Sequence, residues 1–341
     1  MSKPKQLQID CHVHIVGDGS SGSGCELQVE GKVKKLMSRF YCKKIGLPKD
    51  ALDGGNLDTL YVEHLTKLVK ESSLDAVVIL AQDHPYDQET GEKIEDQGLF
   101  YVPNDYVIEL AKAYRFFLPA ISLHPARKDA IAELERLVAS GAVMNKLLPN
   151  CHNVDCSNAD YQPFWRRMAE MKIPLLAHTG GEHTLPVINK NYQDPRYLTG
   201  ALDAGVTVIA AHAGTKSGLF DKDYSKVIRE MLRHYPNLYV DNSAFNLPFR
   251  SRYVVKCLDK KVVGRVLHGS DYPVPISSIW SLLRGFLPIE TFNEARKCKN
   301  PLQKDIILKR AMGFPEDTFY RVAKLLPEGS LQNLQRIGSK F

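Results

Sequence analysis

Two histidines near the start of the chain have a spacing suited to metal binding. His12 and His14 lie in the motif IDCHVH, inside an apolar run at residues 7–16. Successive side chains of an extended strand alternate between faces, so Asp10, His12 and His14 are expected on the same face. Two imidazoles on one face can bind a divalent ion, although an isolated pair on a strand more often has a structural role.

Three further polar residues stand at the ends of later apolar runs. The segments PLLAHTGG, VIAAHAGT and VLHGSDYP place His178, His212 and Asp271 at or just beyond those ends. In α/β barrels the active site lies at the carboxyl ends of the strands, where side chains from different strands meet. Four runs with the same arrangement therefore indicate one shared site.

The sequence pattern predicts that repeated strand-plus-helix units position these residues. Helical patterns such as residues 130–139 and 224–233 separate the β-rich runs, and no Gly-rich phosphate loop or dinucleotide fingerprint opens a helix. The pattern predicts an α/β protein with a (β/α)8 TIM barrel, over a single domain of residues 1–341. The eight expected strands are residues 7–16, 76–81, 116–123, 143–148, 173–177, 206–211, 238–240 and 262–267.

Two segments are additional to the eight strand-plus-helix units of a minimal barrel. A long loop after strand 1, residues 17–56, opens with the glycine-rich GDGSSGSG and contains a basic stretch at residues 32–44. A loop of this length is typical of a lid, a binding loop or an assembly arm. A helical C-terminal extension follows the eighth strand through residues 278–326, with helices expected at 302–312 and 316–325.

The amino-acid composition indicates a folded protein and excludes several other classes. The 341 residues are 44% hydrophobic and 25% charged, with a net charge of +6 and no long run of like charges, so a folded protein without a nucleic-acid partner is expected. No apolar run is long enough to cross a bilayer, and no secretory signal is visible. Seven irregularly spaced cysteines favour a cytoplasmic location over a disulfide framework.

The chain resembles the amidohydrolase superfamily, and within it the amidohydrolase-related group that includes aminocarboxymuconate semialdehyde decarboxylase and several aromatic acid decarboxylases. The resemblance covers nearly the whole chain. It depends on His12, His14, His178, His212 and Asp271, and on the closing segment NPLQKDIILKRAMGFP.

The resemblance implies that His12, His14, His178 and Asp271 bind one divalent metal, usually zinc, and that His212 takes part in catalysis. Three imidazoles and a carboxylate suit Zn²⁺ and leave a position for water or a substrate oxygen. Asp271 would then also accept a proton from water, and His212 would hydrogen-bond the scissile carbonyl or the leaving group.

Lys146, at the end of the fourth expected strand, has three competing interpretations. Some superfamily members carry a carbamylated lysine there that bridges two metals. A contact with a substrate carboxylate and an ordinary structural role are the alternatives, and the single-metal resemblance favours the contact with substrate over the bridge.

Five other residues are candidates for substrate contact because they follow strands. His84 and His124 precede prolines, where a structural hydrogen bond to the turn is the competing interpretation. His183 follows the fifth strand, and Asn242 and Arg250 follow the seventh. Arg250 is a candidate clamp for a carboxylate.

We expect a metal-dependent hydrolase that cleaves a C–N or C–O bond, of amide or lactone type, in a small molecule. The alternative is a metal-dependent lyase, a decarboxylase or hydratase, acting on a small unsaturated or aromatic carboxylic acid. The expected partner in either case is a small molecule, with or without a carboxylate group. The long loop and the resemblance favour a homodimer.

Overall fold

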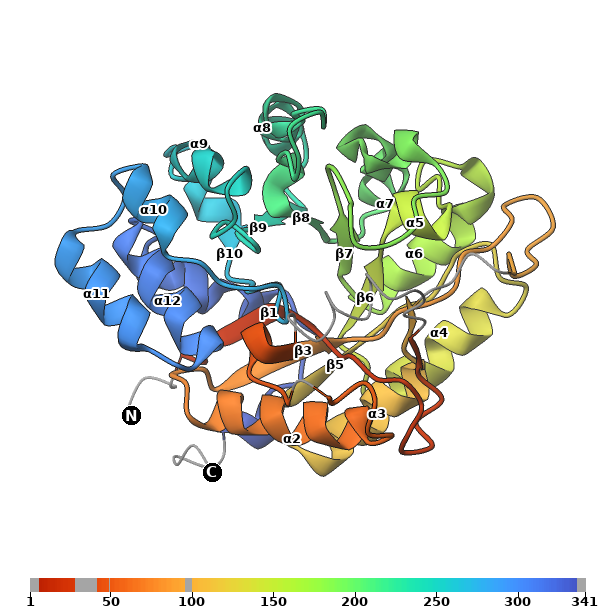
Figure 1. The fold of residues 1–341 in the computed structure, drawn as a ribbon. Helices are drawn as coiled ribbons and strands as arrows, with labels where there is room; N and C mark the ends of the chain where they lie inside the picture. Colours follow the sequence, from red (N-terminus) through yellow and green to blue (C-terminus); the bar gives the residue numbers. More distant parts are fainter. Residues whose placement is uncertain (1–5, 28–41, 49, 96–99, 336–341) are drawn as a thin grey trace.

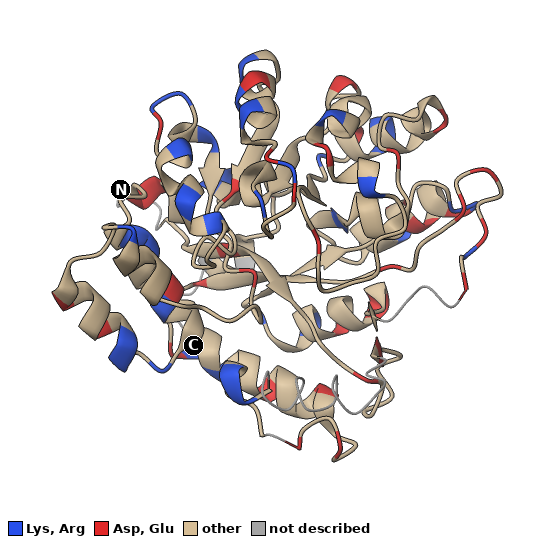
Figure 2. Ribbon diagram, turned by 45° about the horizontal axis from the view of Figure 1, so that its top comes forward, with Lys and Arg blue, Asp and Glu red and all other residues tan. Residues whose placement is uncertain are grey.

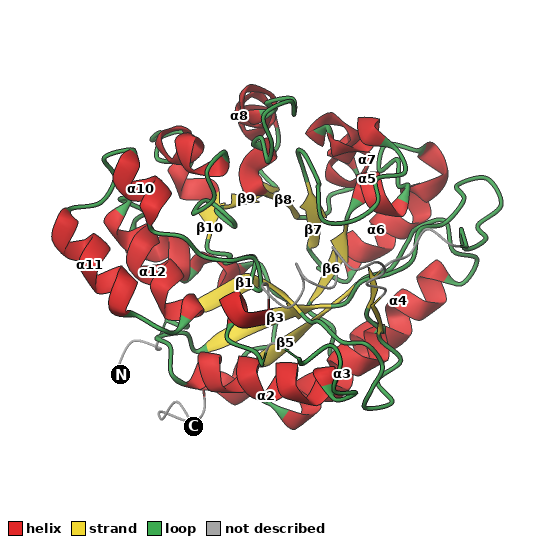
Figure 3. Ribbon diagram, in the orientation of Figure 1, coloured by secondary structure: helices red, strands yellow, loops and turns green. Residues whose placement is uncertain are grey.

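The computed structural model describes residues 6–27, 42–48, 50–95 and 100–335. Eight parallel strands form a nearly closed barrel, and the helices lie around its outside (Figures 1 and 3). All eight strands expected from the sequence are confirmed. They are β1 (Ile9–His14), β3 (Ala76–Leu80), β5 (Phe117–Ile121), β6 (Met144–Leu147), β7 (Leu175–His178), β8 (Val208–Ala211), β9 (Leu238–Asp241) and β10 (Val266–Leu267). Most have shorter bounds than expected, β7 and β9 end one residue later, and a 3-10 turn at Val263–Arg265 reduces the eighth strand to two residues.

The strands neighbour one another in chain order, from β1 to β10. The seam between the first and last strands is joined by backbone hydrogen bonds that continue past the end of β10. Cys11 N donates to His268 O at 3.0 Å, and His14 N donates to Tyr272 O at 2.7 Å. The seam therefore places the segment that carries Asp271 directly beside β1.

Two sets of apolar side chains hold the barrel together. Inward residues from all eight strands form the interior cluster, with Val78 and Leu80 of β3 among them. Alternate residues such as Val77 and Ile79 pack outward against the helices. This alternation leaves polar side chains to fill the barrel interior at the carboxyl ends of the strands.

The helices cover the strands from outside. Ala130–Ala139 matches its expected bounds, whereas the segment expected as a helix at residues 316–325 forms two short 3-10 turns. The principal helices are α2 (Leu57–Lys70), α3 (Asn104–Ala113), α4 (Ala130–Ala139), α5 (Pro149–His152), α6 (Gln162–Glu170), α7 (Thr199–Asp203), α8 (Ser225–His234), α9 (Val254–Cys257), α10 (Ile279–Leu283), α11 (Ile289–Lys297), α12 (Pro301–Ala311) and α13 (Gln332–Gln335).

The glycine-rich start of the long loop is fastened to α2. The buried carboxylate of Asp58 accepts hydrogen bonds from Asp18 N at 2.7 Å, Ser21 Oγ at 2.8 Å and Ser23 Oγ at 2.5 Å. A side chain at Gly17 would meet Asp58 Oδ1 at 2.5 Å, so the close approach requires glycine there. The described part of this segment is therefore fixed to α2 by hydrogen bonds.

The rest of the long loop joins the body of the protein at several points. Strand β2 (Glu26–Leu27) pairs antiparallel with β4 (Phe100–Tyr101). Cys42, Ile45 and Leu47 are buried with the apolar side chains that point outward from β1 and β3. Most of the basic stretch at residues 32–44 lies outside the described residues.

Charged residues of both signs are interspersed over the outer helices (Figure 2). Among the described residues, none of the helices has the length and apolar character needed to cross a membrane.

Candidate metal centre and active site

A bulge in β1 aims both of its histidines into the barrel. Asp10 pairs with Val77 and Val13 pairs with Ile79, so β1 has one residue more than β3 between these points. The extra residue shifts the alternation of the strand. His12 and His14 consequently face inward, whereas Asp10 shares the outward side of Val77 and bonds to Ser270 N at 2.9 Å. The expectation that Asp10 shares a face with the histidines is wrong for this reason.

Three potential ligand atoms form a compact triangle. His12 Nε2 lies 3.2 Å from His14 Nε2 and 3.2 Å from Asp271 Oδ1, and His14 Nε2 lies 3.3 Å from the same oxygen. Ligands about 2.1 Å from one tetrahedral zinc ion are separated by about 3.4 Å. The triangle therefore has the size of one face of a metal coordination sphere.

The hydrogen bonding of His12 is also compatible with a cation in this triangle. His12 Nδ1 lies 2.8 Å from Asp241 Oδ2, which fixes the proton on Nδ1 and leaves a lone pair on Nε2. That lone pair faces the carboxylate oxygen of Asp271, which is also an acceptor. Burial lowers the pKa of His12 below its usual value, while the neighbouring carboxylates of Asp271 and Asp241 act to raise it. A metal ion in the triangle would give both acceptor atoms a partner.

Asp241 is a functional residue that the sequence analysis missed. It ends β9 and is fully buried, and besides His12 it accepts His212 N at 2.8 Å and Ser243 N at 3.1 Å. An acidic residue ending a strand was the available signal, in the run LYVDN. Its carboxylate orients a histidine ligand, as such outer partners do in metal sites.

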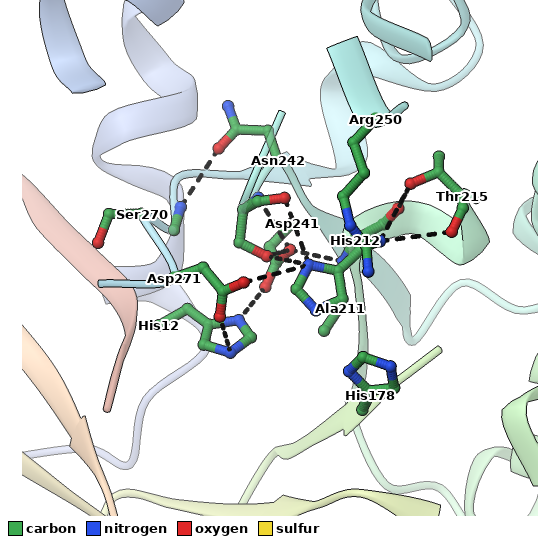
Figure 4. Close-up of polar contacts among 12 residues, drawn as sticks. His12, His178, Ala211, His212, Thr215, Asp241, Asn242, Arg250, Ser270 and Asp271 are labelled. Carbon is green, nitrogen blue, oxygen red and sulfur yellow. Dashed lines mark hydrogen bonds and ion pairs between the residues drawn. The ribbon is translucent and has the colours of Figure 1, made fainter. Parts of the chain in front are cut away.

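His178 and His212 approach the triangle from the neighbouring strands β7 and β8 (Figure 4). Their ring centroids lie 4.9 Å apart, and those of His12 and His212 lie 5.4 Å apart. His178 Nε2 is buried and has no hydrogen-bond partner among the described residues, and burial lowers the pKa of His178 to about 4. Glu182 Oε2 lies 3.7 Å from this nitrogen, beyond hydrogen-bond distance, so the lone pair of a neutral His178 ring is available to a metal.

His212 is held by the residues that follow β9. Its Nδ1 lies 2.8 Å from Ser243 Oγ, whose own hydroxyl hydrogen-bonds to Asp241. His212 has φ +61°, a left-handed conformation that is rare outside glycine and often occurs at functional sites. Ligand atoms of His12, His212 and Asp271 all lie within 4.8 Å of one another, so His212 could also bind an ion.

Asp271 is fixed by its backbone. It has φ +66°, and its N–H donates to His12 O at 2.9 Å. Gly269 passes so close to β1 that an added Cβ would meet His12 Cβ at 2.8 Å. Burial acts to raise the pKa of Asp271, but the charge of His12 and the hydrogen bond with His14 outweigh it and hold the pKa below its usual range.

Two buried cations flank the centre. Lys146 Nζ, on β6, lies 3.3 Å from His12 Nε2, and burial lowers the pKa of Lys146. Arg250 is 3% exposed and donates to Thr215 Oγ1 at 3.2 Å and Gly181 O at 3.4 Å. Among the described residues, neither cation has a carboxylate within 4.0 Å, so both have capacity for an anionic ligand.

The remaining expected substrate residues occupy different surroundings. His124 is satisfied by backbone groups, with Nε2 2.9 Å from His152 O and Nδ1 accepting Ala126 N at 3.0 Å. His183 is exposed and pairs with Asp221 at 3.0 Å. His84 stacks on Tyr101 with ring centroids 4.0 Å apart.

Asn242 supports the loop that carries Asp271. Its Oδ1 accepts Gly269 N at 3.3 Å, whereas its buried Nδ2 has no partner among the described residues. A contact between substrate and Asn242, His84, His124 or His183 stays a prediction, and the backbone bonds of His124 favour a structural role for that residue.

The family model described as amidohydrolase matches residues 9–288. The chain belongs to this amidohydrolase family. The match spans β1 to α10 and so includes every residue of the proposed centre. The family is generally metal-dependent, in agreement with a possible site at His12, His212 and Asp271.

Solved structures show the same barrel. An uncharacterized TIM-barrel protein from Bordetella bronchiseptica shares 17% identity with this amidohydrolase at a TM-score of 0.59, over 93% of this chain and 98% of that one. A putative 2-pyrone-4,6-dicarboxylic acid hydrolase from Pseudomonas putida shares 14% identity at 0.52, over 91% and 98%. The 5-carboxyvanillate decarboxylase from Sphingomonas paucimobilis shares 12% identity at 0.52, over 98% and 100%. No curated protein matches significantly.

Proposed function

We propose that this amidohydrolase is a metal-dependent hydrolase that cleaves a C–N or C–O bond, of amide or lactone type, in a small carboxylate-bearing molecule. The observation that carries the proposal is the triangle of His12, His14 and Asp271, in which acceptor atoms converge at 3.2–3.3 Å. His178 is the proposed fourth ligand, because its buried Nε2 has no partner among the described residues. This donor set suits Zn²⁺.

The chain's own residues can manage the protons of a hydrolysis. A divalent metal held by His12, His14, His178 and Asp271 would supply a Lewis acid that makes water a stronger acid. Asp271 directs Oδ1 to His12 and His14, while its Oδ2 lies 4.0 Å from His212 Nδ1. We assign Oδ2 of Asp271 to accept a proton from water, and His212 to receive that proton and pass it to the leaving group.

The buried basic side chains favour an anionic substrate. Lys146 and Arg250 flank the centre, and neither has a carboxylate within 4.0 Å among the described residues. Both can therefore interact with a carboxylate of the substrate. Arg250 is the proposed partner, because its planar guanidinium can bind a carboxylate through two hydrogen bonds.

A substrate panel tests the reaction. The zinc-loaded protein is incubated with lactones, amides and aromatic or unsaturated acids, and the products are analysed for new carboxylates and for carbon dioxide. Hydrolysis without gas supports the proposal. Release of carbon dioxide from an acid would instead establish the lyase alternative, which needs the same metal ligands.

A further inference from the structure

The inward-facing side chain beyond the end of β3 belongs to Gln82. Ala76, Val78 and Leu80 of this strand all lie in the interior cluster of the barrel. The backbone stays extended past the strand, because Gln82 and Val102 exchange two hydrogen bonds of 3.0 Å. Alternation therefore directs the Gln82 side chain into the mouth of the barrel.

This position adjoins the metal centre. β3 is the neighbour of β1, and Leu80 pairs in register with His14. Gln82 lies two residues beyond Leu80, on the same inward side, at the level of the proposed metal ligands. It is 3% exposed.

One polar atom of the Gln82 amide contacts a neighbouring side chain, and the other has no hydrogen-bond partner among the described residues. As placed in the structure, Gln82 Nε2 lies 2.6 Å from His152 Nε2, and Gln82 Oε1 is the atom without a partner in the described part of the chain. His152 Nδ1 accepts a hydrogen bond from Leu148 N at 3.3 Å, so the ring hydrogen is on Nε2. The amide must then turn its oxygen to His152, since only the oxygen can accept. With the oxygen and nitrogen of the amide exchanged in this way, the NH2 takes the position of the unpartnered atom.

A buried donor costs free energy when no acceptor meets it, and an oxygen of a bound substrate can supply that acceptor. On the basis of the proposed function, we propose that the Gln82 NH2 binds a second oxygen of the substrate. The substrate is then a small molecule with a carboxylate at one end and another acceptor oxygen, from a carboxylate or a carbonyl group, at the other.

The barrel places the two anchors on opposite sides. β3 is second and β8 sixth in the order of eight strands, so they face each other across the barrel. Arg250 bonds to Thr215, four residues beyond β8, and Gln82 lies just beyond β3. A substrate that spans the mouth can therefore meet Arg250 with one end and Gln82 with the other, with the metal ligands between them.

The substitution Gln82→Glu tests this assignment with little change of shape. A glutamate oxygen still accepts the hydrogen of His152 Nε2, so the structural contact is kept, while the NH2 becomes a negative oxygen. The probes are isophthalate and terephthalate, with benzoate as the single-carboxylate control. The meta- and para-(aminomethyl)benzoates carry an ammonium group in place of the second carboxylate. Affinities for the zinc-loaded proteins are measured by calorimetry.

We expect the parent to bind at least one dicarboxylate about tenfold more tightly than benzoate. Gln82→Glu should remove that advantage and leave benzoate within about twofold, and it should bind an aminomethyl benzoate more tightly than the parent does. Gln82→Met, which loses both contacts, should lose the dicarboxylate preference without gaining the ammonium preference.

If Gln82 had a purely structural role, its substitution would weaken the binding of all probes alike. That result, or a parent that shows no preference for either dicarboxylate, would overturn the second anchor. The metal content of each protein is measured in parallel. A parent that binds no metal contradicts the proposed function, whereas unchanged probe selectivity in metal-loaded Gln82→Glu contradicts the Gln82 contact alone.

Discussion

Replacing Asp241 by asparagine perturbs the metal centre without changing a ligand. The asparagine oxygen can still accept the backbone hydrogens of His212 and Ser243, which lie 2.8 and 3.1 Å from Asp241 Oδ1. Its NH2 then faces the Nδ1 hydrogen of His12, at the position where Asp241 Oδ2 now accepts at 2.8 Å. Two donors in contact drive the His12 hydrogen to Nε2, and a protonated Nε2 cannot bind a metal. The dissociation constant for Zn²⁺ should rise about 10-fold to 100-fold, which is about 1.4 to 2.7 kcal/mol.

Competition between each protein and a chelating dye for Zn²⁺ measures this effect. The matched control is Ser243→Ala, which removes the side-chain contacts with Asp241 Oδ1 and His212 Nδ1 but leaves the His12 contact intact. The control should bind Zn²⁺ within about twofold of the parent, and the metal-free proteins should keep similar thermal midpoints. An Asp241→Asn variant that binds Zn²⁺ as tightly as the parent would refute the tautomer argument.

Three further substitutions test separate parts of the protein. His212→Asn should slow turnover by about 10² to 10⁴ with metal content near the parent's, whereas a parallel loss of metal would show that His212 is a ligand. Arg250→Gln should raise KM for a carboxylate substrate about tenfold to a hundredfold, and an unchanged KM would exclude the clamp. Asp58→Asn should lower the free energy of unfolding by about 1–3 kcal/mol at pH 7, measured by urea denaturation. Because hydrogen bonds with Ser23 and Ser21 outweigh burial and lower the pKa of Asp58, its stabilisation is present above about pH 4 and is lost as pH falls through the folded pKa. An equal difference between parent and variant below that range would contradict the assignment.

The barrel was predictable because each strand is a short β-rich run in a repeating unit. Runs such as residues 76–81 and 206–211 bury both faces, one inside the barrel and one against helices, so their composition is unambiguous. The convergence of His12, His14, His178, His212 and Asp271 followed from that topology, since parallel strands bring their carboxyl ends together.

What the sequence did not show depends on local geometry. The bulge that separates Asp10 from His12 changes no residue type, so the alternation rule misplaced Asp10. The role of Asp241 depends on a contact between β9 and β1, which are distant in sequence. The glycine-rich start of the long loop looked flexible because its partner, the carboxylate of Asp58, lies about forty residues away along the chain.

Metal analysis of the purified chain tests the central claim most directly. The convergence of His12, His14, His178 and Asp271 predicts about one divalent ion per chain in the parent, with most of it lost when His12, His14 or His178 is replaced by alanine. Full metal content in all three variants would place the ion elsewhere. Two ions per chain, with a carbamylated Lys146 seen by mass spectrometry, would contradict the single-metal centre.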